Sequence, residues 1–388
     1  MNYKKSESKA ASRAQFKGVW AAITTPFTAD YQVDEAGLRR NMRYFTDGLK
    51  IDGIFCTGTM GEFWSMTKEE RNRVVEIVVE EARGKCKVIA HTGHHSPNET
   101  IDLTLHAQRV GADFAIVMNP YYPAVGEDRI YEWFEYVCAR VDIGVWMFDT
   151  PFSGVALSPE VTARIAKIEN ICGLKCSRPL DHYAQVQKLV GDSIVMSHPG
   201  ESLWLKLMRN YGAKVHMSSA APFLVQTPDA PAMRQYTELG LNGKFAEAEK
   251  IFHAMEPARV VHEKWMRDPW LKNEIIPIAN LKAWCEMIGL AGGPDKCAYV
   301  VNELDSTVLA CRLDEHSGAL QPFQLSSALP DTFFGNSRAA GIAVDAAGQG
   351  RLGQARPDGG RDVGHQRDYS EDVASAIDEE VRAFLRAS

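Results

Sequence analysis

A single lysine stands within the apolar run ICGLKCS, residues 171–177. Runs of this kind are typical of buried strands, where a charged ammonium group is costly. Burial disfavours the protonated form, so we expect a lowered pKa and a nucleophilic amine at Lys175. A neutral amine can condense with a ketone, and the resulting Schiff base acts as an electron sink for cleaving a nearby C–C or C–O bond. The alternative is a lysine that extends to solvent or pairs with a carboxylate.

The stretch GTMGEFWSM, residues 58–66, follows an earlier apolar run. Two glycines flank Thr59 and Met60, so backbone N–H groups there can converge on an anion. The Thr59 hydroxyl could add a further donor. The pattern therefore suggests a site for a substrate carboxylate, with an ordinary loop after a strand as the alternative.

Eight short β-rich runs must position these groups, and helical patterns lie between most of them. Near-continuous apolar strands that alternate with amphipathic helices favour a parallel sheet covered on both faces. Eight units close a (β/α)8 barrel, whose catalytic groups sit at the C-terminal ends of the strands. An open doubly wound sheet is the alternative, but no GxGxxG follows the first run. The runs are residues 20–27, 53–58, 87–93, 114–120, 143–151, 171–177, 194–200 and 213–219.

Two helical segments carry clear start signals. Residues 67–84 open on Thr67 with Glu70 three positions later, a capping box. Residues 158–168 open on Ser158, with Pro159 at the first helical position. Both patterns therefore predict helices that begin in the segments between the predicted strands.

The chain divides by composition. Residues 226–292 are helical throughout, while residues 297–324 show a β-hairpin pattern with EHSG as its turn. Residues 346–362 are rich in Gly and Arg, which indicates an unstructured linker, and a short amphipathic helix follows. We predict a disordered N-terminus, a TIM barrel, a C-terminal helical extension and a largely disordered tail, at residues 1–14, 15–225, 226–294 and 295–388.

Composition excludes several classes of protein. The 388 residues are 45% hydrophobic, enough for a large core, and the net charge of −7 with no basic stripe argues against a nucleic-acid partner. No apolar run is long enough to span a bilayer, and the N-terminus lacks the apolar segment of a signal peptide. The eight scattered cysteines include no CxxC pair. We therefore expect a reduced, cytoplasmic protein without structural zinc.

Six motifs in order resemble the dihydrodipicolinate synthase and N-acetylneuraminate lyase family of class I aldolases. They are ITTPF, GTMGE, VIAHTG, NPYYP, FDTP and GLKCS, within residues 15–294. The resemblance implies a (β/α)8 barrel, a Schiff base with pyruvate or another 2-oxo acid, no cofactor, and a dimer or tetramer. It matches Lys175 to the imine-forming lysine, and Thr59 with the Met60 backbone to the carboxylate site. Tyr122 matches a tyrosine that reaches toward a neighbouring subunit's active site.

This sequence departs from the family pattern at the proton-transfer groups. The family has a tyrosine three residues before Pro151, where this chain has Phe148. An arginine that grips a substrate carboxylate in the synthase branch is Ser153 here, and the second threonine of the GTTGE pattern is Met60. A synthase of the dipicolinate precursor is therefore not expected, and another group must move protons.

Two polar residues could replace the missing phenol. His198, in MSHPGES, replaces a residue that is normally glycine at the end of the seventh run, and its ordinary pKa suits acid–base work. Its alternative is a loop histidine with local hydrogen bonds. Asp149 follows Phe148 and is a second candidate. The cluster HTGHH, residues 91–95, suggests a metal site, but no carboxylate accompanies it and Schiff-base chemistry needs no metal.

Three functions remain open from the sequence. The first is a Schiff-base lyase or aldolase that acts on a 2-oxo acid and an unidentified aldehyde. The second is a sugar-acid dehydratase that uses the same lysine, and the third is a catalytically impaired barrel that binds a small molecule. An aromatic set (Phe63, Trp64, Tyr121, Tyr122 and Phe152) could line a pocket for a bulky aldehyde. The predicted catalytic residues are Lys175 and His198; the predicted substrate-binding residues are Thr59, Met60, Tyr122, Phe148, Asp149 and Ser218.

The tail resembles two unrelated proteins. Residues 297–345 resemble one blade of a lactonase-type propeller, and residues 364–382 resemble the C-terminal piece of an AAA metalloprotease. A lone blade cannot close a propeller, and the second piece carries no catalytic motif. The resemblance therefore implies a fusion, a rearrangement or an assembly error, and neither function is carried over.

Overall fold

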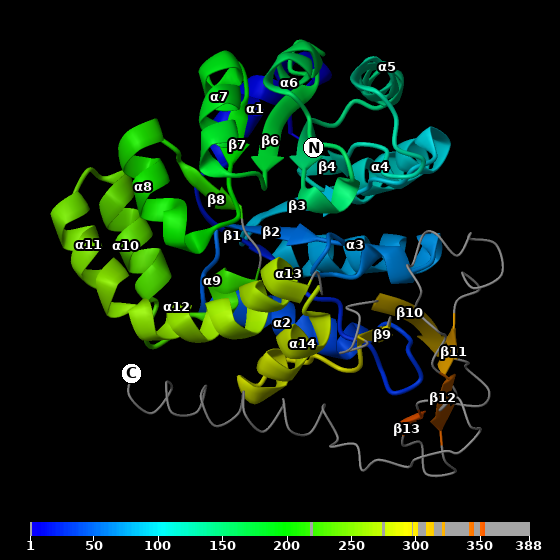
Figure 1. Cartoon of the computed structure of the whole chain (residues 1–388). Helices are drawn as coiled ribbons and strands as arrows, with labels where there is room; N and C mark the ends of the chain where they lie inside the picture. Colours follow the sequence, from blue (N-terminus) through cyan, green and yellow to red (C-terminus); the bar gives the residue numbers. More distant parts are fainter. Residues whose placement is uncertain are drawn as a thin grey trace.

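The computed structural model of the chain describes residues 2–217, 220–273 and 276–296, together with five short strands between residues 298 and 353. Eight parallel strands form a nearly closed barrel in the order β7-β6-β5-β4-β3-β2-β1-β8 (Figure 1). Ser197 of β7 completes the circuit, because its hydroxyl oxygen accepts a 2.7 Å hydrogen bond from the Met217 amide of β8. The strands are β1 (Gly18–Ala22), β2 (Gly53–Cys56), β3 (Lys87–His91), β4 (Phe114–Met118), β5 (Val145–Asp149), β6 (Ile171–Cys176), β7 (Val195–Ser197) and β8 (Val215–Met217).

Seven helices alternate with the strands and lie outside the barrel, as the apolar spacing predicts. The start signals are confirmed: Thr67 and Glu70 form a capping box at α3, and the Ser158 hydroxyl caps α6 ahead of Pro159. The seven are α2 (Glu35–Arg43), α3 (Lys68–Ala82), α4 (Pro97–Val110), α5 (Glu127–Cys138), α6 (Pro159–Ile165), α7 (Leu180–Val190) and α8 (Glu201–Tyr211).

The expectation of a disordered N-terminus is wrong. Residues 5–15 form a short 3₁₀ turn (Lys5–Glu7) and α1 (Ser8–Gln15), which closes the base of the barrel. The Trp146 indole donates to the Ser12 hydroxyl at 3.2 Å, and the Tyr3 hydroxyl donates to the Asp113 carbonyl at 2.5 Å. Ser8 and Ser12 are buried against the barrel, while the opposite side of this helix is exposed.

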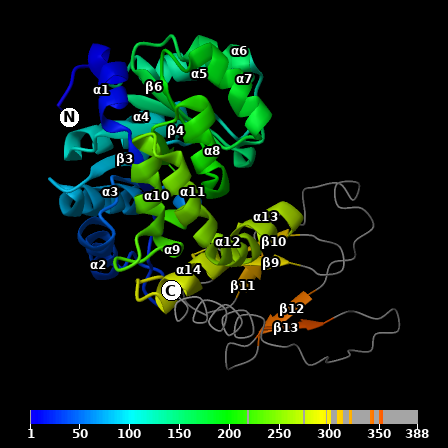
Figure 2. The same ribbon diagram turned by 90° about the vertical axis from the view of Figure 1, so that its left-hand side faces the viewer.

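The helical extension is joined to the barrel by a buried charged cluster. Glu201 of α8 pairs with Arg259 at 2.6 Å and accepts a 2.7 Å hydrogen bond from the Tyr236 hydroxyl. Figure 2 shows α10 and α11 beside α8, where they pack. The short α9 (Ala221–Leu224) follows β8. The extension consists of α10 (Ala232–Leu241), α11 (Phe245–Ala254), α12 (Glu256–His262), α13 (Asp268–Asn273) and α14 (Ile278–Met287), with a π-helical turn (Glu263–Arg267) before α13.

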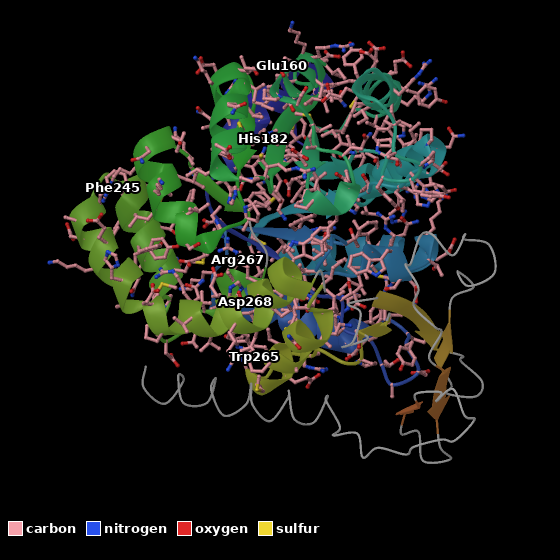
Figure 3. All side chains as sticks on the ribbon, viewed as in Figure 1. Glu160, His182, Phe245, Trp265, Arg267 and Asp268 are labelled. Carbon is pink, nitrogen blue, oxygen red and sulfur yellow. The ribbon has the colours of Figure 1, made fainter. Side chains whose placement is uncertain are left out.

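Two apolar cores follow from strand periodicity. Side chains from alternate strand positions fill the barrel interior, among them Trp20, Phe55 and Trp146. The remaining strand positions pack under the surrounding helices and form the larger core. The interior is thus a packed core rather than a channel, and side chains occupy the space between the ribbons (Figure 3).

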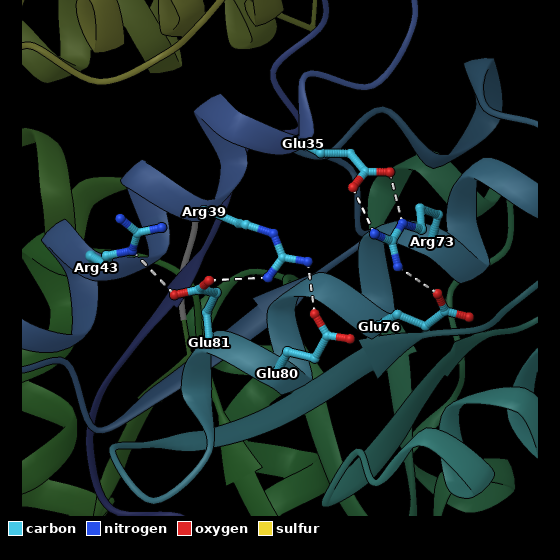
Figure 4. Close-up of polar contacts among 7 residues, drawn as sticks. All are labelled: Glu35, Arg39, Arg43, Arg73, Glu76, Glu80 and Glu81. Atoms are coloured by element: carbon cyan, nitrogen blue, oxygen red, sulfur yellow. Dashed lines mark hydrogen bonds and ion pairs between the residues drawn. The ribbon is translucent and has the colours of Figure 1, made fainter.

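Charged side chains bridge α2 and α3 on the surface (Figure 4). Arg39 contacts Glu80 at 2.7 Å and Glu81 at 3.0 Å, and Arg73 contacts Glu35 at 2.6 Å. Pairs this exposed contribute at most about 1 kcal/mol each. Because the two signs alternate, this helix pair offers no basic stripe.

Beyond residue 296 the structure describes backbone strands alone. β9 (Ala298–Val301), β10 (Val308–Leu313) and β11 (Leu320–Pro322) pair antiparallel, which agrees with the predicted hairpin, and its EHSG turn lies outside the described residues. β12 (Gly341–Val344) pairs with β13 (Gly350–Gly353), so part of the predicted linker is a strand. Residues 354–388, with the predicted terminal helix, lie outside the described residues. Among the described helices, none has the length and apolar character needed to cross a membrane.

Candidate active site

Lys175 lies inside the barrel near the C-terminal end of β6. Its side chain is 5% exposed, and Nζ lies 4.6 Å from the ring centroids of both Phe55 and Phe148. Burial lowers the pKa of this lysine from 10.5 to about 7. Near neutral pH a substantial share of the amine is therefore unprotonated and able to attack a carbonyl.

The loop after β2 has the conformation expected for an anion site. Thr57 adopts a positive φ of 52°, and the amides of Gly61 and Phe63 both donate to the Gly58 carbonyl. No described residue accepts a hydrogen bond from the amides of Thr59 or Met60. Two donors thus remain available at the end of the barrel that holds Lys175.

Glu62 fixes the far end of this loop. It is 1% exposed, pairs with Lys282 of α14 at 2.6 Å, and accepts a 2.9 Å hydrogen bond from the Lys296 amide. The helical extension therefore holds the loop in place. The sequence motif marks Glu62, but nothing local in the sequence predicts its distant partner.

His198 does not have the geometry expected of a proton donor to Lys175. Its Nδ1 accepts a 3.0 Å hydrogen bond from the Gly200 amide, so Nε2 carries the proton and donates it to the Arg178 carbonyl at 3.0 Å. Burial lowers its pKa to about 4. Both ring nitrogens are held by backbone groups, one in the same loop and one after β6, which is closer to the alternative of a hydrogen-bonded loop histidine.

Asp149 also differs from the expectation. It lies one residue beyond Phe148, on the outer face of β5, and pairs with Arg178 at 2.8 Å. His182 of α7, labelled in Figure 3, comes within 3.7 Å of the same carboxylate. Burial raises the pKa of Asp149, and the Arg178 guanidinium opposes that effect. Strand alternation thus turns this carboxylate away from Lys175.

The histidine cluster after β3 separates into two parts. His91 lies inside the barrel, 1% exposed, while His94 and His95 contact each other with ring centroids 4.0 Å apart. Among the described residues the one group of potential metal ligands is Asp149, Cys176 and His182, and Arg178 already occupies that carboxylate. The sequence marks His91 only as part of a candidate metal motif, so its inward position was missed.

Comparison with known proteins decides the family. The sequence model of the dihydrodipicolinate synthetase family matches residues 15–294. A 4-hydroxy-tetrahydrodipicolinate synthase of Methanothrix thermoacetophila is 32% identical over 281 residues, which cover 72% of this chain and 89% of that protein. The chain belongs to the dihydrodipicolinate synthetase family. It is a carbon–carbon lyase of the class I aldolase type, as the ordered motifs imply.

Solved structures agree with this family. Dihydrodipicolinate synthase from Aquifex aeolicus has a TM-score of 0.64 at 30% identity, covering 72% of this chain and 90% of that one. YagE from Escherichia coli, in complex with pyruvate, shares the fold with a TM-score of 0.62 at 23% identity, covering 72% and 90% of the two chains. A second sequence model, that of the seven-bladed lactonase propeller, matches residues 291–350. The expected likeness of the tail to a propeller blade is thus confirmed over that stretch.

The position where the resemblance predicts a proton-transfer tyrosine holds a phenyl ring. Phe148 is 3% exposed and points into the barrel beside Lys175. The Ser153 hydroxyl donates within its own turn, to the carbonyls of Thr150 and Val155. A phenyl ring, and not the expected phenol, therefore lies beside the lysine.

The remaining predicted residues fall in different places. Tyr122 is 75% exposed, and Ser218 lies outside the described residues. Phe63 contacts Trp64 and Tyr121, with centroids 5.4 and 6.3 Å apart. Phe152 instead packs on Trp270 of α13 at 4.2 Å. The aromatic set thus forms two separate contacts near the barrel mouth rather than one continuous wall.

Proposed function

We propose that Lys175 forms a Schiff base with pyruvate or a related 2-oxo acid and uses it to make or break a C–C bond to an aldehyde. The observation that carries this proposal is the buried amine between Phe55 and Phe148, with its pKa lowered to about 7. Thr59 and the Met60 amide would bind the substrate carboxylate.

Borohydride trapping tests the proposal. Incubation with pyruvate and borohydride should add a stable mass to Lys175, and Lys175→Ala should give no adduct. Because the free amine is the nucleophile, the rate of trapping should rise with pH up to about 7 and then level off. Absence of an adduct under conditions that label another class I aldolase would overturn the proposal.

A sugar-acid dehydratase with the same lysine is a second candidate. Ser153 favours it over a dipicolinate-precursor synthase, because this buried side chain bonds within its own turn and offers no charge to a second substrate carboxylate. Product analysis separates the two candidates: an aldolase releases an aldehyde, and a dehydratase releases water from a sugar acid. A folded protein with neither turnover nor imine would support a binding role instead.

We also propose a homo-oligomer, a dimer or tetramer, that works in the cytoplasm. The 75% exposure of Tyr122 supports an interface at that loop. All six cysteines whose side chains are described are free thiols, which suits a reducing compartment. Within this proposal, residues 15–225 are the barrel, residues 226–294 its extension, and residues 295–388 an addition with no catalytic part.

A further inference from the structure

His91 is the one histidine of HTGHH that ends a strand inside the barrel. The ring stands edge-to-face to Phe63, with centroids 4.5 Å apart, and edge-to-face to Phe148 at 6.2 Å. Phe148 in turn lies 4.6 Å from Lys175 Nζ. His91 and Lys175 therefore share Phe148 as a neighbour, and that is the position where this chain lacks the family's phenol.

The hydrogen bonds of His91 define its tautomer. Nδ1 lies 3.0 Å from the Thr57 carbonyl, which can only accept, so Nδ1 carries the proton. Nε2 therefore presents a lone pair. This atom is buried and has no hydrogen-bond partner among the described residues. A buried nitrogen without a partner is unusual in a folded protein, so this atom is available to a ligand or to a reacting group.

The backbone around His91 is held rigidly. The Thr57 hydroxyl donates to the His91 carbonyl at 2.9 Å, and the buried Arg71 guanidinium donates to the same carbonyl at 2.9 Å and to the Gly93 carbonyl at 3.2 Å. Burial, the Arg71 charge and the Lys175 charge lower the pKa of His91. The imidazole is thus fixed in place and neutral, with an unprotonated Nε2.

We propose that His91 Nε2 moves the protons of imine formation at Lys175, in place of the phenol absent at position 148. This inference rests on the proposed function. Attack of the amine on the ketone forms the C–N bond and leaves a positive nitrogen and an alkoxide. His91 takes a proton from that nitrogen, and solvent protonates the alkoxide. Protonated His91 then gives its proton to the hydroxyl group, which leaves as water while the nitrogen lone pair forms the iminium.

The decisive variant is His91→Asn. Its amide can still donate to the Thr57 carbonyl from the place of Nδ1, but it has no group in the place of Nε2. With pyruvate and cyanoborohydride, the rate of adduct formation should fall by about 10²–10⁴-fold. The matched control is His94→Asn, in the same loop, where Nδ1 accepts only the local Ser96 amide. Its rate should stay close to that of the unmodified chain.

A rescue experiment separates chemistry from structure. Adding Phe148→Tyr to His91→Asn returns a phenol beside Lys175 and should recover at least about tenfold of the lost rate. If His91→Asn does not fold, His91→Gln replaces it, with the same expected loss and rescue.

Each outcome separates the two proposals. An unmodified chain that forms no adduct overturns both of them. A normal adduct rate in folded His91→Asn, or a loss that Phe148→Tyr does not repair, overturns the role of His91 and leaves the proposed function standing.

Discussion

The two ends of the barrel differ in how many of their buried polar groups form hydrogen bonds. At the base, Tyr3 and Ser12 bond to barrel groups, and Lys5 and Lys9 donate to the carbonyls of Cys138 and Ala166. At the opposite end, buried polar atoms without a partner among the described residues follow several strands; they belong to Thr24, Trp64, His91, Asn119 and Thr150. At the base, one oxygen of Gln15 and one of Asn170 also have no partner within the described part of the chain.

The two ends of the barrel therefore contribute differently to stability and to the proposed chemistry. Hydrogen bonds at the base satisfy groups that folding removes from water, so they stabilise the fold. Unpaired groups at the other end lower stability but leave donors and acceptors available to a substrate. The bonded groups at the base thus stabilise the barrel, while the groups at the opposite end are available for the proposed reaction.

Lys175→Met tests how much the buried amine at the C-terminal end of the barrel lowers stability. It should give the largest effect on stability. Between pH 7 and 10.5 the unfolded chain binds more protons than the folded one, so the stability of the unmodified protein rises with pH. Met removes the buried amine, and the free energy of unfolding should rise by about 2–5 kcal/mol at pH 7. The gain should vanish as the pH approaches the lysine's ordinary pKa.

Denaturant unfolding at several pH values measures this gain. The control is Lys206→Met on the exposed face of α8, which should change stability by no more than about 0.5 kcal/mol. A destabilised Lys175→Met protein would show that the amine is well accommodated and would remove the contrast between the two ends.

Tyr3→Phe tests the base and should give an intermediate effect. The Tyr3 hydroxyl donates to the Asp113 carbonyl and accepts from the Gly144 amide at 3.0 Å, so its loss leaves both backbone groups unpaired. We expect a loss of about 1–3 kcal/mol in the free energy of unfolding. Imine trapping at Lys175 should be unchanged. Tyr136→Phe, at an exposed site, is the matched control.

His198→Ala should give the smallest kinetic effect. Both ring nitrogens bond to backbone groups of Gly200 and Arg178, so we expect that removing the ring takes no proton-transfer group from Lys175. The trapping rate should fall by less than about tenfold, below the usual contribution of a general acid or base. A loss of a hundredfold or more would return His198 to the mechanism and weaken the case for His91.

The repeated units of the fold could be predicted from the sequence, because apolar strands and capped helices are local patterns. Lys175 could also be predicted, since an amine in a buried strand is rare enough to point to chemistry. α1 was missed because its buried face is made of serine and alanine, which carry no hydrophobic signal.

Side-chain direction at the strand ends was harder to predict. Asp149 lies one residue beyond Phe148, and that single step turns it to the outer face of β5. His198 and His91 both follow apolar runs, but their local hydrogen bonds decide which ring nitrogen is available. Those bonds depend on loop conformation and on Arg71 and Thr57, which the sequence does not pair with His91.

Glu62 has a consequence for anything joined to the end of the barrel's extension. This residue ends the loop that we propose binds the substrate carboxylate, and it accepts a hydrogen bond from the Lys296 amide, at the junction where the lactonase-like sequence begins. A mechanical load on the tail, from a fused domain, an affinity tag or a surface attachment, would therefore reach this loop through the Glu62 carboxylate and reach α3 through the ion pair of Lys296 with Glu70. Immobilisation through the N-terminus would instead place that force on the opposite end of the barrel.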